Sequence, residues 1–467
     1  RHIVNPDLQI RCKMKWGNGM HEYKQSEFTT LSPTDNGDYV LYNSLAGLNS
    51  LCIVDRSALS SVTECFQKGC TATAENSIFE TLIETGHLVS KIDNEIAKLN
   101  YMRSNLVNNP CLHLVIHTTQ ACNFSCQYCF LDHQPNRLSL PVQQEIISFI
   151  DKNIHRYSGL NISWFGGEPL LEMAAIERIS LKAIEICRRN HKPFTAEITT
   201  NGYLLTSERL KKLISLSVLD YVITLDGLAG LHDSLRPTIN HQGTFETIIN
   251  NLLYLHNKIH SKAISVTIRS NLIKPSLSHL DDFYSYLSAL FGDDTRFSLL
   301  IRPVSDWGGE KIKKIKESLL SADDMGDVYK KMSHKKMPLK FRGNIENLEF
   351  GGMTCTACWK NKYTIGVNGN ISKCDNSTPV LTIGNLDNGR MIVNPYQEAT
   401  WNNQIFLNDK SCMNCTLRGI CFNGRCAKCV IHQEQSCCMT KSELEGLLQL
   451  AVYTMKEGIG TCRTLKK

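Results

Sequence analysis

The sequence lacks the features that would place the chain in or across a membrane. No apolar run reaches the roughly 20 residues that a spanning helix needs, and no signal-peptide pattern opens the chain. Basic stretches interleaved with aromatic residues are also missing, and the lysines of 311–316 and 330–340 are typical of solvated helix faces. The composition therefore predicts a cytoplasmic protein without a membrane partner, and it argues against nucleic acid as a partner.

Cysteine, by contrast, is abundant. The 467 residues include 20 cysteines, with 42% hydrophobic residues and a net charge of +6. A chain of this length has room for several domains with a sizeable core. Because no secretory signal accompanies the cysteines, they favour metal or cluster ligation over a disulfide scaffold.

Three of the cysteines share one short loop with the spacing C-x3-C-x2-C. They are Cys122, Cys126 and Cys129, and Tyr128 precedes the last of them. Three thiolates from one loop can hold three irons of a four-iron cluster, which leaves the fourth iron open to a substrate. The alternative is a structural zinc site, but such a site needs four ligands and no fourth is near in the sequence.

Strand-like and helix-like segments alternate between residues 112 and 304. The alternation predicts the α/β class, with a parallel sheet, right-handed crossovers and a partial (β/α)6 barrel of TIM type. Polar and glycine-rich motifs follow the strand ends, where such barrels hold their active sites. The expected strands are 112–117, 161–165, 194–200, 219–225, 263–270 and 297–304, and the expected helices are 142–157, 173–189, 207–216, 245–258 and 280–290.

The cysteine loop and its aromatic residue resemble the radical S-adenosylmethionine (SAM) superfamily, and so does Gly-Gly-Glu-Pro at 166–169. The resemblance implies that the open iron of a [4Fe-4S] cluster chelates SAM. It further implies that one electron, from a flavodoxin- or ferredoxin-type donor, releases a 5′-deoxyadenosyl radical. For strand-end polar residues the alternative is helix capping. The implied SAM-binding residues are Tyr128, Gly166, Gly167, Glu168, Pro169, Thr200, Asn201, Thr224, Arg236 and Arg269.

A second group of cysteines near the C-terminal end resembles the SPASM domain, which carries two auxiliary [4Fe-4S] clusters. The step from Cys421 to Cys426 is one residue longer than the domain's pattern, and the last ligand is open between Cys437, Cys438 and Cys429. A zinc ribbon is the alternative, although it would use only four cysteines. The resemblance implies one cluster on Cys355, Cys358, Cys374 and Cys426, and another on Cys412, Cys415, Cys421 and Cys438.

Asp375 directly follows Cys374. In the sulfatase-maturing relatives an Asp at this place takes a proton from the substrate, so the resemblance implies a catalytic base. The alternative is a residue that only forms a turn.

The N-terminal region breaks the alternating pattern. Two strands, 39–42 and 51–55, are followed by helices at 77–88 and 92–107. The pattern resembles a winged-helix-like precursor-recognition module, which binds a leader peptide as an added strand. The alternative is a cap that covers the barrel. The expected domains are a recognition module (1–108), the barrel (109–310), a helical bridge (311–352) and the SPASM domain (353–467).

Together these resemblances imply a radical SAM oxidoreductase that modifies a ribosomally synthesised precursor peptide. Hydrogen abstraction would be followed by formation of a thioether or carbon–carbon cross-link. One alternative is a formylglycine-type sulfatase-maturing enzyme, which has little need of the N-terminal module. Another is an iron–sulfur electron-transfer or scaffold protein, against which the loop with an open iron argues.

Overall fold

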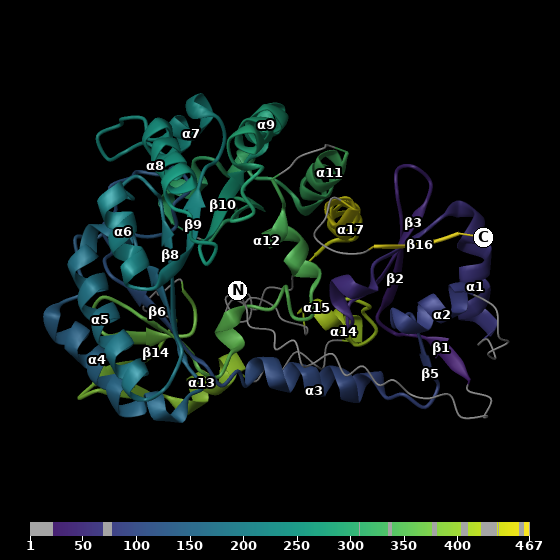
Figure 1. Cartoon of the computed structure of the whole chain (residues 1–467), viewed down its shortest axis with the longest axis horizontal. Coiled ribbons are helices and arrows are strands. Elements are labelled where there is room, and N and C mark those ends of the chain that lie inside the picture. Colours follow the sequence, from purple (N-terminus) through teal and green to yellow (C-terminus); the bar gives the residue numbers. More distant parts are fainter. Residues whose placement is uncertain are drawn as a thin grey trace.

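The computed structural model describes residues 22–68, 77–307, 309–334, 339–375, 381–402, 410–421, 437, 439–456 and 462–466. Two lobes lie side by side along the longest axis (Figure 1). The larger lobe is built on a twisted sheet and the smaller one on the N-terminal strands and helices. One long helix, α3 (Glu95–Val107), runs between them. None of the helices in the described part of the chain combines the length and apolarity needed to cross a bilayer.

The larger lobe is the expected partial barrel. Its six parallel strands neighbour one another in sequence order, which confirms the predicted α/β class. The strands are β6 (Leu112–His117), β7 (Leu160–Phe165), β8 (Phe194–Thr200), β9 (Val218–Thr224), β10 (Ser265–Leu272) and β11 (Phe297–Pro303). The crossovers hold α4 (Leu140–Asn153), α5 (Met173–Arg189), α6 (Ser207–Ser215), α7 (Ala229–Leu235), α8 (Phe245–Lys258) and α9 (Leu280–Phe291).

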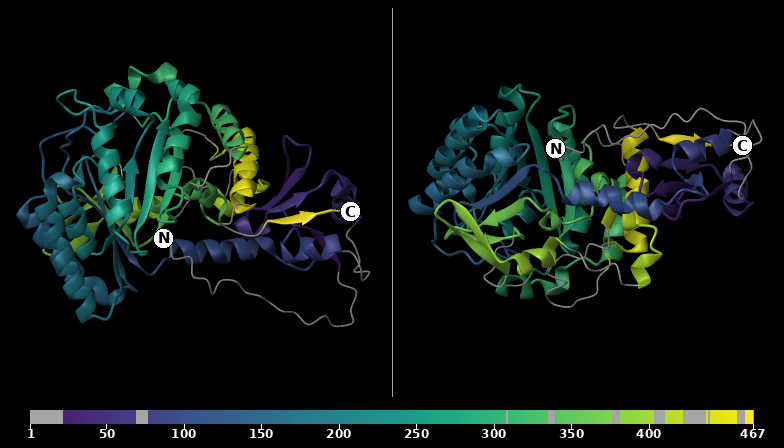
Figure 2. Two further views of the ribbon diagram at one scale, coloured as in Figure 1. Left: turned by 45° about the horizontal axis from the view of Figure 1, so that its top comes forward. Right: turned by 90° about the horizontal axis from the view of Figure 1, so that it is seen from below.

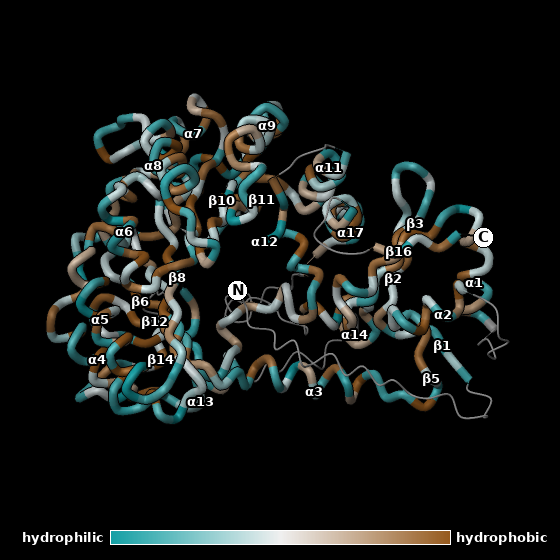
Figure 3. Tube along the Cα trace, viewed as in Figure 1, coloured by the Kyte–Doolittle hydropathy of each residue, from teal (hydrophilic) through white to brown (hydrophobic). Residues whose placement is uncertain are grey.

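Side chains alternate between the two faces of each barrel strand. In β7, Leu160, Ile162 and Trp164 are buried, whereas Asn161, Ser163 and Phe165 are only partly buried. The buried set belongs to one large apolar core shared with α4 and α5, and the hydrophobic segments of the strands stand out in Figure 3. The other set faces the inside of the barrel, because successive residues of a strand point to opposite faces.

The barrel sheet continues into the cysteine-rich region. Strand β12 (Lys362–Ile365) pairs in parallel with β6 and forms an antiparallel hairpin with β13 (Asn370–Ser372). Gly369 has a φ of 84° in the turn, a conformation that glycine adopts without strain. The sheet ends with β14 (Thr382–Asp387) and β15 (Arg390–Val393), and α13 (Pro395–Asn402) follows.

The smaller lobe holds a four-stranded sheet in the order β16-β4-β3-β2. The predicted pair of strands is present as β3 (Tyr39–Asn43) and β4 (Cys52–Val54), and they are antiparallel. The expected helix at 77–88 is too long: α2 (Ser77–Glu84) ends before Gly86, whose φ is 78°. The remaining elements are β1 (Tyr23–Gln25), β2 (Thr29–Pro33), α1 (Leu59–Lys68) and β5 (Leu88–Ser90).

Elements from the last part of the chain join the two lobes. The helix α17 (Lys441–Thr454) packs along α11 (Ala322–Ser333) so closely that a Cβ on Gly446 would overlap the backbone of Gly326. Both helices lie between the lobes (Figure 2). The other elements of this part are α10 (Glu310–Lys313), α12 (Arg342–Ile345), α14 (Lys410–Met413), α15 (Arg418–Cys421) and β16 (Arg463–Leu465).

Candidate active site and cysteine loops

The loop after β6 carries the three closely spaced cysteines. Cys126 is buried and Cys122 and Cys129 are partly buried. The backbone N–H of Phe124 lies 3.4 Å from the Cys122 sulfur, and the Cys129 sulfur lies 3.3 Å from His133 Nε2. The loop thus presents three unbridged thiols at the carboxyl end of the first barrel strand.

Two cationic side chains lie near Cys126 and Cys129. Burial raises the pKa of Cys122 to about 12, and burial also raises the pKa values of Cys126 and Cys129. The positive charges of Arg236 and Lys311 act in the opposite direction on Cys126 and Cys129. Thiolates bound to iron would therefore find compensating charge in the protein, because a coordinating thiol is deprotonated.

The loop after β7 packs directly against the cysteine loop. The N–H of Gly167 donates to the carbonyl of Thr119 (2.9 Å), and the N–H of Glu168 donates to that of Ala121 (2.9 Å). A Cβ on Gly167 would overlap the Ala121 carbonyl oxygen. Glycine is therefore required for the close approach of these two backbones.

The side chain of Glu168 links the ends of β7 and β8. Its side chain is fully buried and accepts hydrogen bonds from Thr200 Oγ1 (2.7 Å), the N–H of Asn201 (2.8 Å) and the N–H of Leu170 (3.0 Å). Burial raises the pKa of Glu168, and these hydrogen bonds oppose that rise. Both carboxylate oxygens are thus engaged within the protein, and a contact between Glu168 and the SAM amino group stays a prediction. Pro169 begins the short turn that follows.

A second polar network is centred on Tyr128. Its hydroxyl donates to Asp226 Oδ2 and accepts from Arg236 (2.6 Å) and from Asn271 Nδ2 (3.2 Å). Arg236 lies 3.8 Å from Asp226, and both side chains are buried. Arg269 Nε donates to Asn271 Oδ1 (2.9 Å). The structure therefore brings Tyr128, Arg236 and Arg269 together behind the cysteine loop.

The predicted strand-end residues lie beside these two networks. Thr224 is the register partner of Arg269 on the neighbouring strand. Asn201 Nδ2 donates to Asn123 Oδ1 (2.8 Å), which ties the end of β8 to the cysteine loop. Polar groups from β6, β8, β9 and β10 thus meet at one end of the barrel.

The donors at this end fit an iron–sulfur cluster with a polar ligand. Asn123 Nδ2 and Arg236 Nε are buried and have no hydrogen-bond partner among the described residues. No three His, Cys, Asp or Glu side chains in the described ranges converge on a point where a single metal ion would bind. In a four-iron cluster each of the three thiolates binds a different iron.

Asp375 lies beside β12. Its Oδ1 accepts hydrogen bonds from Lys362 Nζ, with which it forms an ion pair, and from Thr364 Oγ1 (3.2 Å). Its charge also bears on His117 of β6 and Glu197 of β8. Burial raises the pKa of Glu197, and the negative charge of Asp375 acts in the same direction. Asp375 therefore faces the inside of the barrel, while its role as a base stays a prediction.

The first auxiliary group of cysteines surrounds the β12–β13 hairpin. Cys355 and Cys374 pack against one small apolar cluster that includes Ile371 and Trp401. Cys358 is buried, and burial raises its pKa to about 12, with the charge of Cys355 adding to that rise. Cys426, the fourth predicted member, lies outside the described residues.

Lys373 is a buried cation beside this group. Its Nζ donates to the carbonyl oxygens of Trp359 (2.6 Å) and Lys360 (3.2 Å) and lies 4.6 Å from the centre of the Tyr363 ring. Burial lowers the pKa of Lys373 to about 7.

The second auxiliary group gathers at α14 and α15. Burial raises the pKa of Cys415, and the charges of Cys421, Cys437 and Cys412 add to that rise, which places all four thiols within electrostatic reach. The predicted last ligand, Cys438, and the alternative Cys429 lie outside the described residues, whereas Cys437 is described and exposed.

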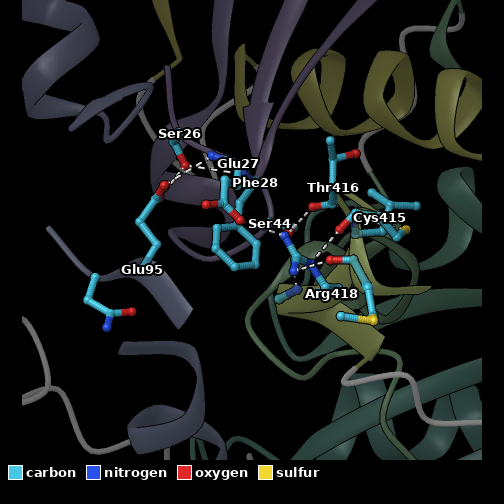
Figure 4. Close-up of polar contacts among 12 residues, drawn as sticks. Ser26, Glu27, Phe28, Ser44, Glu95, Cys415, Thr416 and Arg418 are labelled. Atoms are coloured by element: carbon cyan, nitrogen blue, oxygen red, sulfur yellow. Dashed lines mark hydrogen bonds and ion pairs between the residues drawn. The ribbon is translucent and has the colours of Figure 1, made fainter. Parts of the chain in front are cut away.

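Arg418 fastens this second loop to the N-terminal lobe (Figure 4). Its guanidinium donates to the carbonyls of Cys415 (2.9 Å) and Met413 and to Glu27 (3.1 Å), and it lies 4.9 Å from the centre of the Phe28 ring. On the same side, Ser44 Oγ donates to the Thr416 carbonyl (2.5 Å).

Several of these residues were not predicted from the sequence. The polar networks at the site also include Asn123, Asp226 and Asn271. Lys362 binds Asp375, and Arg418 binds the second cysteine loop. Asn123 lies inside the cysteine loop, and Asp226 directly follows the expected strand 219–225, so the positions of these two residues were a signal in the sequence. Lys362 and Arg418 contact residues that are distant in the sequence, so no local sequence pattern indicates their roles.

The matches to known proteins concern the barrel part of the chain. The sequence model of the Radical SAM superfamily matches residues 116–287. An uncharacterised protein of Methanocaldococcus jannaschii is 27% identical over 192 residues, which are 40% of this chain and 62% of that protein. The radical SAM cyclopropyl synthase TigE of Paramaledivibacter caminithermalis is 27% identical over 165 residues, which are 29% of this chain and 34% of that protein.

The match to the first three curated relatives spans 62%, 44% and 49% of their own length, so the chain covers about half of each. Among solved structures, native anSMEcpe with bound AdoMet and Cp18Cys peptide is similar with a TM-score of 0.54 and 17% identity. That likeness covers 74% of this chain and 98% of the other, and it concerns the fold. The superfamily implies SAM and a [4Fe-4S] cluster as cofactors. Residues 116–287 of the chain therefore match the Radical SAM superfamily.

Proposed function

We propose that the protein is a radical SAM enzyme that modifies a ribosomally synthesised precursor peptide and forms a cross-link in it. The observation that carries the proposal is the meeting of the three-cysteine loop with the Glu168 and Tyr128 networks at one end of the barrel. When bound there, the cluster and SAM supply a radical that abstracts a hydrogen atom from the substrate.

The residues of this chain have distinct parts in the proposal. Cys122, Cys126 and Cys129 would hold the cluster, and Gly167 allows the loop after β7 to pack against the cysteine loop. Glu168 holds Thr200 and Asn201 in place. Among the predicted contacts, Arg236 and Arg269 supply positive charge for the carboxylate of SAM, since a charge-assisted hydrogen bond is stronger than a neutral one.

The peptide part of the proposal is supported by three observations. The N-terminal lobe has the predicted strands and lies next to the second cysteine loop (Figure 4). Asp375 is hydrogen-bonded to Lys362 of β12, and in the proposal it is the residue that takes the substrate proton. The structure of anSMEcpe, which shares the fold, was solved with a peptide bound. The two auxiliary cysteine groups would hold clusters that accept the surplus electron left after the reaction. A flavodoxin or ferredoxin would deliver the electron that starts SAM cleavage.

A count of iron and sulfide in protein reconstituted without oxygen tests the cofactor part. Three four-iron clusters give about twelve of each per chain. About four of each, with bound zinc, would mean that the C-terminal cysteines are structural. In that case the auxiliary clusters drop out of the proposal.

Cys126→Ala tests the radical chemistry. We expect the variant to lose about four irons per chain and to form no 5′-deoxyadenosine, because three thiolates seat the cluster. Cys187→Ala is the matched control, because it removes a buried thiol of α5 outside the cysteine loop. This variant should retain its full iron content and still form 5′-deoxyadenosine. Full SAM cleavage by Cys126→Ala would remove the central claim.

Tandem mass spectrometry of a reacted precursor tests the product. The substrate to test is a leader-and-core peptide, sought among short reading frames that neighbour the gene. A cross-link suppresses the fragments between the two joined residues, whereas oxidation of one Cys or Ser alters a single residue and leaves all fragments. The second result would favour the formylglycine-type reaction over the one proposed.

A further inference from the structure

His133 contacts one of the three thiols of the cysteine loop. Its Nε2 lies 3.3 Å from the sulfur of Cys129, four residues earlier in the chain. Both side chains are partly buried. A thiolate bound to iron has no proton to give, so in the cluster-bound state this contact is a hydrogen bond that the imidazole N–H donates to the sulfur.

A second element brings a cation to the same loop. The segment that begins α10 passes beside the loop, since a Cβ on Gly309 would lie 3.9 Å from the carbonyl oxygen of Cys129. Ile312 of α10 is buried in an apolar cluster against which Tyr128 packs. These two contacts fix the position of Lys311, which lies between Gly309 and Ile312 in the sequence.

The positive charge of Lys311 reaches two of the thiols. Burial raises the pKa values of Cys126 and Cys129, and the charge of Lys311 opposes that rise. Arg236 acts in the same direction, but it is also bonded to the hydroxyl of Tyr128. Replacement of Lys311 therefore removes a charge from the loop without breaking the Tyr128 network.

Both groups favour a cluster that has taken up an electron. Reduction adds a negative charge, which the thiolate sulfurs share with the rest of the cluster. An N–H group and a nearby cation stabilise the reduced cluster more than the oxidised one. Hydrogen bonds to the sulfurs and local charge therefore raise the reduction potential.

We propose that His133 and Lys311 raise the reduction potential of the SAM-binding cluster, through a hydrogen bond to Cys129 and a positive charge beside it. The inference rests on the radical SAM part of the proposed function, because it needs the cluster on the three cysteines. It assigns a role to two residues outside both the cysteine spacing and the polar networks of the site. A donor of less negative potential would then suffice to start SAM cleavage.

A redox titration of the reconstituted protein at constant pH tests the inference. The readout is the electron paramagnetic resonance signal of the reduced cluster that changes when SAM is added, because this change distinguishes the SAM-binding cluster from auxiliary ones. We expect the equilibrium constant for reduction to fall about tenfold in His133→Phe, a shift of about 59 mV to more negative potential for a one-electron couple. Lys311→Met should shift the potential in the same direction.

Two further variants are matched controls. His133→Gln retains an N–H donor of similar reach and should keep the potential of the unaltered protein. Lys313→Met removes an exposed lysine of the same helix, which pairs with Glu310 (2.6 Å), and should also leave the potential unchanged. If His133→Phe binds too little iron to be titrated, Lys311→Met decides the matter, because it lies on another element.

Unchanged midpoint potentials in His133→Phe and Lys311→Met would overturn the inference. An equal shift in Lys313→Met would also overturn it, since the overall surface charge would then explain the effect. Both results leave the radical chemistry intact, because the signal that responds to SAM is still present. Absence of that signal from the unaltered protein would instead contradict the radical SAM part of the proposed function, and the inference with it.

Discussion

At the scale of single residues, the buried charges behind the cysteine loop form a balanced set. Asp226 has no exposed side-chain surface, and it lies beside Arg236, the Tyr128 hydroxyl and the N–H of Asn271. Burial raises the pKa of Asp226, and the Arg236 charge and the two hydrogen bonds oppose that rise. Burial also acts against the charge on Arg236, yet its pKa stays well above the usual value because the charges of Cys126, Tyr128 and Asp226 outweigh burial. Each charge therefore depends on the other.

Removing one of these partners should cost more than removing both. We expect Arg236→Met to lower the free energy of unfolding by about 3–5 kcal/mol, because it leaves a buried carboxylate without its partner. Adding Asp226→Asn should recover at least about 1 kcal/mol of that loss, since residues in one network couple. Denaturant titrations of the two single variants and the double variant measure the coupling. Strictly additive losses would show that the two charges do not compensate one another.

His87 is a buried neutral residue of the N-terminal lobe. Its Nε2 donates to the Ser50 carbonyl (2.8 Å) and its Nδ1 accepts from the Thr29 hydroxyl (3.1 Å). Burial lowers the pKa of His87 to about 4. Between about 6.5, the ordinary value, and about 4 the unfolded chain therefore binds a proton that the folded chain does not.

The stability contributed by His87 is present above about pH 6.5 and is lost as the pH falls toward 4. We expect the apparent Tm of His87→Gln to fall less between pH 7 and pH 5 than that of the unaltered protein. His260→Gln, at an exposed histidine, is the control and should follow the unaltered protein. An identical fall for His87→Gln would mean that His87 does not contribute to the acid sensitivity.

At the scale of elements, the two loops after β6 and β7 behave as one unit. They are joined by backbone hydrogen bonds at Gly167 and Glu168, and a side chain at Gly167 has no room. The geometry of the cysteine loop therefore depends on the loop that follows the next strand.

Gly167→Ala should displace the cysteine loop without removing a thiol. We expect a loss of about four irons per chain after reconstitution, the content of one cluster. Gly230→Ala in α7 is the matched control, since a Cβ there meets nothing within 4 Å and a helical Ala is favoured over Gly. Iron counts of the two variants decide the matter, and an unchanged count in Gly167→Ala would show that the loops adjust independently.

At the scale of the whole molecule, the N-terminal lobe is not a detachable unit. Val40, Tyr42 and Leu51 belong to the same apolar core as the barrel, and the Tyr42 hydroxyl donates to the Leu348 carbonyl (2.5 Å). Arg418 ties the lobe to the second cysteine loop. Point substitutions are therefore better tests of the lobe than its deletion, which would expose part of the main core.

Arg418→Ala should loosen the second cysteine loop. The variant loses charge-assisted hydrogen bonds to two backbone carbonyls and to Glu27, each worth about 1.5–3 kcal/mol. We expect a lower apparent Tm and up to about four fewer irons per chain, with the SAM-binding cluster retained. Arg390→Ala, at an exposed position of β15, should change neither quantity. Full iron content in Arg418→Ala would mean that the loop holds its shape without this contact.

Much of the barrel could be predicted from local patterns. The helices at 173–189 and 245–258 and the strand at 194–200 have the predicted bounds, because each is long enough to show its own periodicity. The cysteine spacing and the Gly-Gly-Glu-Pro motif also lie within short stretches, so the residues that indicate the chemistry are close together in the sequence. The three-residue strands β1, β5 and β16 are too short for a period to be counted in this way.

Only the tertiary structure decided which distant segments meet. The pairing of β12 with β6 and of β16 with β4, the bond between Lys362 and Asp375, and the position of Arg418 over Phe28 all join residues that no local pattern relates. By itself the sequence determined the alternation of elements and the donor atoms of the cysteine loops. Edge pairing and buried ion pairs depend on which free edges and unpaired charges remain once the core has packed, and for that reason they follow from the whole fold.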